Sequence, residues 1–143
     1  MIERLFLSTF VYVVTGVVLC VAGTLGVALS LRRSGATRRV SLVGAVIPVA
    51  MGLSYFAMYM GLLSVTTSGR SQSLFRFLGY TVTAIGTAYI LGMLVDLSRR
   101  QYALLAGVIL SFPWLTLVSW LVTGALESVL TLLILASYLT GIY

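Results

Sequence analysis

Lysine and histidine are absent from this sequence, and acidic residues and cysteine are almost absent. Its 143 residues include nine arginines, three acidic residues (Glu3, Asp96 and Glu127) and one cysteine, Cys20. Without histidine there is no imidazole ligand for haem and no imidazole proton relay. One cysteine and three scattered acids do not suffice for a catalytic metal site, and a serine or cysteine nucleophile has no histidine or lysine base. The composition therefore predicts a protein that is not an enzyme and holds no metal.

Two further absences narrow the function. A single cysteine excludes a disulfide within the chain, so Cys20, in the middle of an apolar run, is expected to serve packing. No Asp or Glu occupies the middle of any apolar run, although a proton pump normally needs carboxylates along a mid-membrane path. The sequence therefore argues against a proton pump.

Apolar residues dominate what is present. They make up 60% of the chain against 8% charged residues, and the mean hydropathy is +1.12. A soluble domain is about a quarter charged, so this chain cannot cover a surface that faces water. The composition indicates an integral membrane protein whose solvent is lipid.

The apolar runs are long enough for helices that cross a bilayer, which needs roughly 20 residues. In lipid, the backbone hydrogen bonds must be satisfied within the protein, and the sequence lacks the period-2 alternation that would indicate strands. We therefore predict an all-α membrane protein, a single domain over residues 1–143, with polar connections at 34–39 and 66–72. The first run is too long for the core of a signal peptide, and Glu3 stands where a positive flank belongs, so we expect a retained span. The five predicted spans are residues 5–31, 40–65, 74–97, 101–122 and 127–143.

The arginines predict an orientation. The first and third connections hold six of them, and the opposite side holds Arg4, Arg70 and, at a helix end, Arg76. The positive-inside rule then places the N-terminus outside and the C-terminus in the cytoplasm of a multi-pass protein of the cell membrane. Arginines in short connections contact lipid headgroups, so the partner we expect is the bilayer and not nucleic acid. The six arginines are Arg32, Arg33, Arg38, Arg39, Arg99 and Arg100.

Small and aromatic residues are abundant inside the spans. Glycines allow close helix approach, which favours a tight bundle. Most rings are expected to serve packing and the interfacial belt, and a minority to line an apolar ligand pocket. The aromatic residues concerned are Tyr55, Phe56, Tyr59, Phe77, Tyr80, Tyr89, Phe112, Trp114 and Tyr138.

The charged residues near the spans have two interpretations each. Arg76, near the outer end of the third span, either reaches the outer headgroups or is a buried cation that governs the electrostatics of a cavity. Asp96 is interpreted as a solvated carboxylate at a helix end beside Arg99 and Arg100, and Glu127 as an acid at a helix N-terminus.

Two spans carry residues at a characteristic spacing. In the second span, Pro48 is followed by Tyr55 seven positions later and by Gly61 six further on. This pattern resembles the second helix of the microbial rhodopsin family. The third span opens at residues 75–83 in a way that resembles the family's Arg-Tyr-x-Asp-Trp-x-x-Thr-Thr-Pro stretch, and it ends similarly at residues 94–96. Residues 121–127, between the fourth and fifth spans, resemble the archaeal sensory-rhodopsin branch, and the resemblance extends over residues 5–143.

The resemblance implies a fold, a ligand and a site. It implies the first five helices of a seven-helix bundle that holds retinal. Matched position by position, it implies a set of residues that line a retinal-like pocket or lie in the extracellular half of the bundle. These residues are Tyr55, Arg76, Tyr80, Thr83 and Phe112.

Several family positions differ in this chain. The counterion aspartate, three residues after the arginine, is Gly79; the stacking tryptophan is Tyr80; and the proton-donor position is Ile90. The Thr and Pro that follow Thr83 in the family are Ala84 and Ile85. No lysine is present to form the Schiff base, so retinal could bind only noncovalently or with a partner that supplies the lysine.

Three functions therefore remain open. The first is an opsin-related protein that does not pump by itself, as a truncated form, a degenerate relative or part of a split assembly. The second is a small transporter or channel subunit whose copies surround a pore, and the third is a structural assembly partner. In each case we expect a homo-oligomer or pairing with complementary helices.

Overall fold

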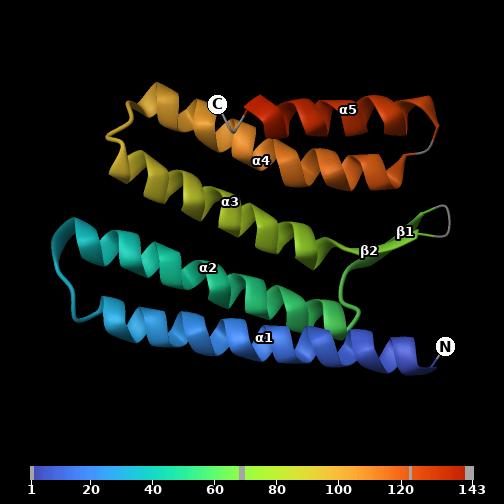
Figure 1. The fold of residues 1–143 in the computed structure, drawn as a ribbon, viewed down its shortest axis with the longest axis horizontal. Coiled ribbons are helices and arrows are strands. Elements are labelled where there is room, and N and C mark those ends of the chain that lie inside the picture. The colour runs from blue at the N-terminus through green and yellow to red at the C-terminus, as the bar shows by residue number, and fades with distance from the viewer. Residues whose placement is uncertain (1, 68–69, 123, 141–143) are drawn as a thin grey trace.

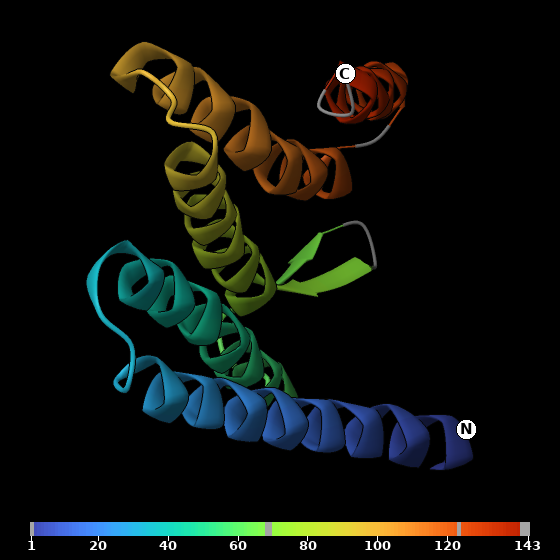
Figure 2. The same ribbon diagram turned by 60° about the vertical axis from the view of Figure 1, so that its left-hand side comes forward.

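In the part of the chain that the structure describes, five helices follow one another in an antiparallel array (Figure 1). The computed structural model describes residues 2–67, 70–122 and 124–140. Within them, each helix has its main contacts with its neighbours in sequence. In both Figures 1 and 2, α1 and α5 lie at opposite edges, and the helices do not close into a ring. The helices are α1 (Ile2–Ser30), α2 (Gly35–Tyr59), α3 (Leu74–Leu94), α4 (Arg99–Leu121) and α5 (Ala125–Thr140).

Four of these helices have the length and composition of membrane spans, which confirms the predicted α-helical membrane class. They cover Thr9–Ser30, Gly35–Tyr59, Leu74–Leu94 and Arg99–Leu121. The apolar part of α5, Ala125–Ala136, is shorter. A fifth crossing over residues 127–143 stays a prediction, and residues 141–143 lie outside the described residues.

The predicted bounds of the second span were wrong at both ends. Residues 35–39, predicted as a connection, form the first turns of α2, for which Ser34 is the N-cap residue. At the other end α2 stops at Tyr59, not at residue 65, because Gly61 takes a left-handed conformation (φ +67°). The amides of Gly61 and Leu62 then donate to the carbonyls of Met58 and Ala57, which is the Schellman pattern of a helix end.

The connection between α2 and α3 is a β-hairpin, which was not predicted. Strand β1 (Ser64–Thr67) pairs antiparallel with β2 (Arg70–Ser73), with Ser64 opposite Ser73 and Thr67 opposite Arg70. β-branched residues in β1 favour the extended backbone. The hairpin continues directly into α3, for which Ser73 is the N-cap residue.

Small residues at intervals of seven allow the first two helices to pack closely. A Cβ added at Gly23 of α1 would lie 2.8 Å from the Ala45 carbonyl oxygen of α2. One added at Gly52 of α2 would lie 2.8 Å from the Gly16 carbonyl oxygen of α1. Two positions seven residues apart on each helix, 16 and 23 on α1 and 45 and 52 on α2, thus bring the two backbones together.

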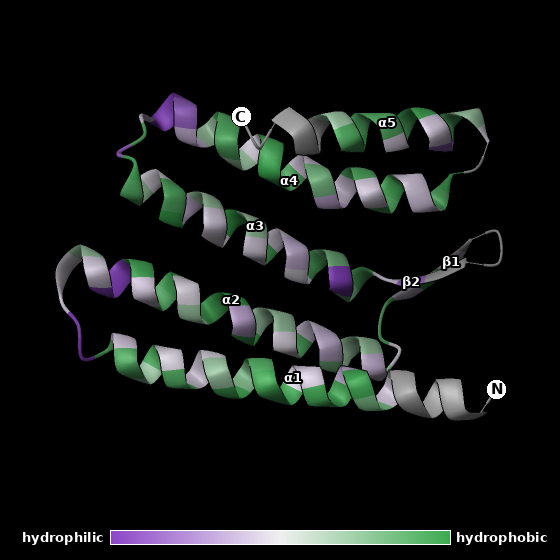
Figure 3. Cartoon of the chain, viewed as in Figure 1, coloured by the Kyte–Doolittle hydropathy of each residue, from purple (hydrophilic) through white to green (hydrophobic). Residues whose placement is uncertain are grey.

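The distribution of apolar side chains is the reverse of that in a soluble protein. Among the residues described, the buried apolar positions are mainly alanines, with Phe77 and Leu117. Large apolar side chains such as Val18, Leu25 and Leu132 are more than half exposed. In water such a surface would aggregate, whereas in lipid it is the expected exterior. Figure 3 shows the hydrophobic colour along the helices and the hydrophilic colour concentrated near their ends.

Candidate functional site

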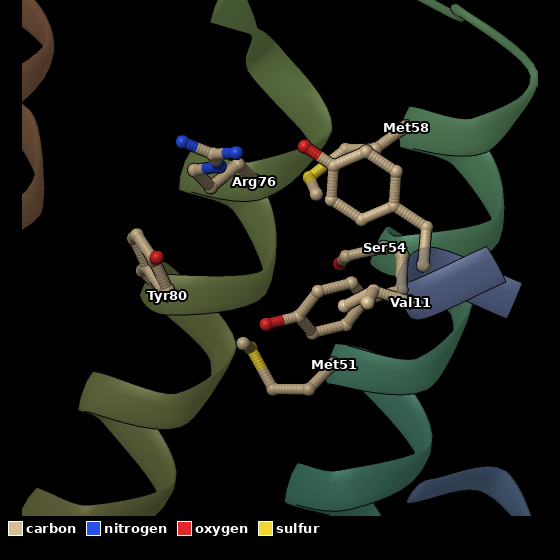
Figure 4. A pocket seen from close by; sticks show the side chains of 8 residues that line it. Val11, Met51, Ser54, Met58, Arg76 and Tyr80 are labelled. Carbon is tan, nitrogen blue, oxygen red and sulfur yellow. The ribbon is translucent and has the colours of Figure 1, made fainter. Parts of the chain in front are cut away.

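A pocket of about 210 Å³ lies between α1, α2 and α3, at the end of the bundle where the hairpin projects. Figure 4 shows Val11 from α1, Met51, Ser54 and Met58 from α2, and Arg76 and Tyr80 from α3 around it. Tyr12 and Tyr55 complete the wall, with ring centroids 6.0 Å apart. The pocket therefore combines one guanidinium and three phenols with thioether and apolar groups.

Close packing of α3 on α2 positions this wall. A Cβ added at Gly79 would lie 2.5 Å from the Ser54 Oγ and 3.1 Å from the Met51 Sδ. Ser54 is itself buried and donates a hydrogen bond to the Ala50 carbonyl, 2.9 Å away. The absence of a side chain at position 79 thus allows α3 to lie against α2, with Arg76 and Tyr80 on either side of the contact.

The Arg76 guanidinium is half-buried. Its Nη1 donates to the Gln72 Oε1 at 3.2 Å, and within the described part of the chain it forms no ion pair. Arg76 also lines a more polar cavity of about 440 Å³ beneath the hairpin, together with Ser64, Gln72 and Ser73. Arg76 thus lines two cavities, and both interpretations of its side chain stay predictions.

A third cavity, of about 410 Å³, lies between α3 and α4. Its threonine hydroxyls are mostly used by the helix backbones: Thr83 donates to the Gly79 carbonyl at 3.0 Å, and Thr116 to the Phe112 carbonyl at 2.8 Å. Their methyl groups therefore remain for the cavity wall, which is largely apolar. The lining residues are Tyr80, Thr83, Ala84, Thr87, Ile109, Phe112, Pro113 and Thr116.

All five predicted site residues line either the pocket of about 210 Å³ between α1, α2 and α3 or the cavity of about 410 Å³ between α3 and α4. Tyr55 and Arg76 line the first, Thr83 and Phe112 line the second, and Tyr80 lies between the two and lines both. The Tyr80 ring is held edge-on against Phe77, with centroids 6.1 Å apart, and Phe77 is 2% exposed. The cavities are thus two compartments on either side of α3.

The sequence reasoning missed several lining residues. Thr87 and Thr116 follow Thr83 and Phe112 by one helical turn, so the i, i+4 spacing could have indicated them. Tyr12 had no such signal, because a helix that is apolar all round does not reveal which face meets its neighbour.

The remaining charged and aromatic candidates lie elsewhere. Asp96 is exposed and takes a left-handed conformation (φ 53°) just after α3, and Glu127 lies in the first turn of α5. Tyr59 and Trp114 are exposed, while the side chain of Tyr138 lies outside the described residues. Within the described residues, no three His, Cys, Asp or Glu side chains come together as a metal site would require.

In comparisons with known proteins, no family model and no curated protein matches this chain. The resemblance to microbial rhodopsins therefore depends on the sequence motifs at Pro48–Gly61 and at residues 75–83, 94–96 and 121–127.

Proposed function

We propose that this chain is an opsin-related membrane protein that holds an apolar ligand of the retinal kind noncovalently in the cavity between α3 and α4. One observation carries the proposal: Tyr80, Thr83 and Phe112, assigned to a retinal-like pocket by resemblance, line a single apolar cavity. Its volume of about 410 Å³ lies within the range of small-molecule sites. A flat polyene suits a space between two helices whose wall is rings and methyl groups.

The same proposal excludes proton pumping by this chain alone. No lysine is present for the Schiff base, and Ile90 stands at the donor position. The counterion position is Gly79, where even a Cβ would lie 2.5 Å from the Ser54 Oγ. An aspartate at position 79 would therefore not fit between α2 and α3 unless Ser54 moved.

The proposed orientation places the N-terminus outside and the C-terminus inside the cell. Its support is that the α1–α2 and α3–α4 connections lie at the same end of the array (Figure 1). Six of the nine arginines lie at or beside these connections. The positive-inside rule assigns such an end to the cytoplasm. The pocket between α1, α2 and α3 that Arg76 lines is at the opposite end and would therefore lie toward the outside.

A titration with all-trans retinal in lipid nanodiscs tests the ligand proposal, with the fluorescence of Trp114 and Trp120 on α4 as the readout. We expect saturable quenching in the original chain. Phe112→Ala should weaken binding about ten-fold, equivalent to about 1.4 kcal/mol, because it removes an aromatic wall of the cavity. Phe10→Ala is the matched control, since Phe10 is exposed on α1 and lines neither cavity. Quenching that rises linearly with retinal and is the same in all three proteins would contradict the proposal.

A further inference from the structure

A groove of about 330 Å³ lies between α1 and α2, at the end opposite the hairpin. Its walls are small or apolar for most of their length, and its mouth is polar. The groove extends along α1 from Ala22 to the helix end at Ser30, about 12 Å of helix, and on to Arg33 just beyond it. This length is a little less than half of a hydrocarbon core of about 30 Å. The lining residues are Ala22, Gly26, Leu29, Ser30, Arg33, Ser41, Gly44, Ala45 and Pro48.

Arg33 is held at the mouth of this groove. Arg33 lies in the connection between α1 and α2, and its Nη1 donates to the Ser41 Oγ of α2 at 2.8 Å, which holds the guanidinium beside the start of α2. Arg32, Arg38 and Arg39 are exposed beside it. The sequence has no Asp or Glu between Glu3 and Asp96, so this cluster has no acidic residue of its own segment to neutralise it. Figure 3 shows the hydrophilic colour at this connection and along the start of α2.

The N-terminus of α2 adds to the positive potential at the same place. Ser34 is its N-cap residue, but the Ser34 side chain makes no capping hydrogen bond. The first amides of a helix have no partner within the helix, and together with the helix dipole they favour an anion. An anion at the mouth would therefore meet a held guanidinium, neighbouring arginines and the start of a helix.

Deeper in the groove the surface becomes apolar. Ser30, although polar, donates to the Gly26 carbonyl at 2.6 Å and is 2% exposed, so it presents no free hydroxyl. Below it, Gly26, Ala22 and Pro48 have little or no polar side-chain surface. The small side chains leave a channel that continues from the charged mouth into the hydrocarbon region.

We propose that this groove binds one anionic phospholipid, with its phosphate on Arg33 and one acyl chain along α1 and α2 toward Ala22. The charge at the mouth selects an anionic headgroup, and the apolar channel selects a lipid over free phosphate. Basic pockets between membrane helices bind such headgroups. This inference rests on the membrane spans and is independent of the retinal proposal.

Native mass spectrometry of the full chain in mild detergent, with equal amounts of dioleoyl phosphatidylglycerol and dioleoyl phosphatidylcholine, tests this site. We expect one phosphatidylglycerol to be retained in preference to phosphatidylcholine. Arg33→Gln should lower that retention about five-fold, the effect of one arginine near an anionic headgroup. Arg33→Lys should restore most of it, because the charge returns.

Two matched controls distinguish the groove from general positive charge. Arg99→Gln removes one exposed arginine at the same end, outside the groove, and should leave retention nearly unchanged. Ala22→Leu narrows the apolar channel and should reduce retention, whereas Ala28→Leu, exposed on the same helix but outside the groove, should not. If Arg33→Gln loses helicity, the Ala22→Leu and Ala28→Leu pair decides the result.

Three outcomes would overturn the proposal. Equal loss in Arg33→Gln and Arg99→Gln would show a diffuse charge effect, and equal retention of the two lipids would show no headgroup selection. Displacement of the lipid by millimolar inorganic phosphate would show an anion site that does not use the acyl chain.

Discussion

At the scale of single residues, glycines have opposite roles in this molecule according to what faces them. Gly79 faces Ser54 and Met51 of α2 so closely that a Cβ has no room, whereas a Cβ at Gly107 of α4 would meet nothing within 4 Å. The first glycine allows two helices to approach, and the second only leaves a helix surface without a side chain. Glycine inside a helix is intrinsically unfavourable, so its presence at Gly79 is compensated by packing.

This contrast predicts the effects of one substitution at two sites. Gly79→Ala should lower the free energy of unfolding by about 1–3 kcal/mol, because the added methyl group overpacks the α2–α3 contact. Gly107→Ala should raise it by about 0.5–1 kcal/mol, because alanine is the better helix former. Unfolding in mixed micelles with increasing dodecyl sulfate measures both. Equal effects of the two variants would mean that α3 does not lie on α2 as described.

At the scale of elements, the number, type and order of the helices could be predicted from hydropathy, but the first and last residues of α2 could not. Hydropathy reports whether a segment is apolar, not where its helix ends. Because Leu62, Leu63 and Val65 are apolar, the predicted second span extended past the end of its helix. The backbone turns earlier, at Gly61, and the next residues pair as a hairpin. Likewise, the cavity-lining residues within the motifs could be assigned from the resemblance. The place of Tyr12 in the pocket wall could not, because it depends on which face of α1 meets α2.

The end of α3 allows a prediction at this scale. Asp96 takes the left-handed conformation that glycine usually fills, and the Leu97 amide donates to the Gly92 carbonyl at 3.1 Å across it. Asp96→Gly should therefore stabilise the protein by up to about 1 kcal/mol, by relieving the strain of a Cβ at positive φ. Asp96→Ala keeps the Cβ and removes the charge, so it should not stabilise. The same unfolding assay measures both variants. An equal gain in stability for Asp96→Ala and Asp96→Gly would mean that the effect comes from removal of the carboxylate and not from relief of backbone strain.

At the scale of the whole molecule, the two ends of the array differ in charge. Single cysteines introduced into a Cys20→Ala background at Ser34 and Ser68 test the proposed orientation; Ser68 lies outside the described residues. A membrane-impermeant maleimide should label position 34 only from the cytoplasmic side and position 68 only from outside. Labelling with the sides exchanged would contradict the orientation.

The open array also predicts association. The helices do not close into a ring (Figure 2), and α4 and α5 expose many large apolar side chains, among them Leu104, Val108, Leu126 and Leu132. Small residues on helix surfaces, such as Gly107, favour close contact with another helix. We therefore expect the chain to self-associate or to pair with complementary helices. Single-molecule photobleaching in nanodiscs at low protein density should show two or more steps per particle, and a monomer whose thermal stability is unchanged on dilution would contradict this expectation.

Noncovalent binding of retinal between α3 and α4 should give retinal an induced circular dichroism band. Retinal free in lipid has no such band, whereas a polyene held in one orientation by a protein does. We expect a band that saturates at one retinal per chain and that is lost in Thr87→Phe, which fills the cavity, but kept in Thr24→Phe, exposed on α1. Borohydride reduction followed by mass spectrometry should leave the mass of the chain unchanged, because no lysine can form the imine. Absence of the induced band at saturating retinal, or a covalent adduct, would contradict the account.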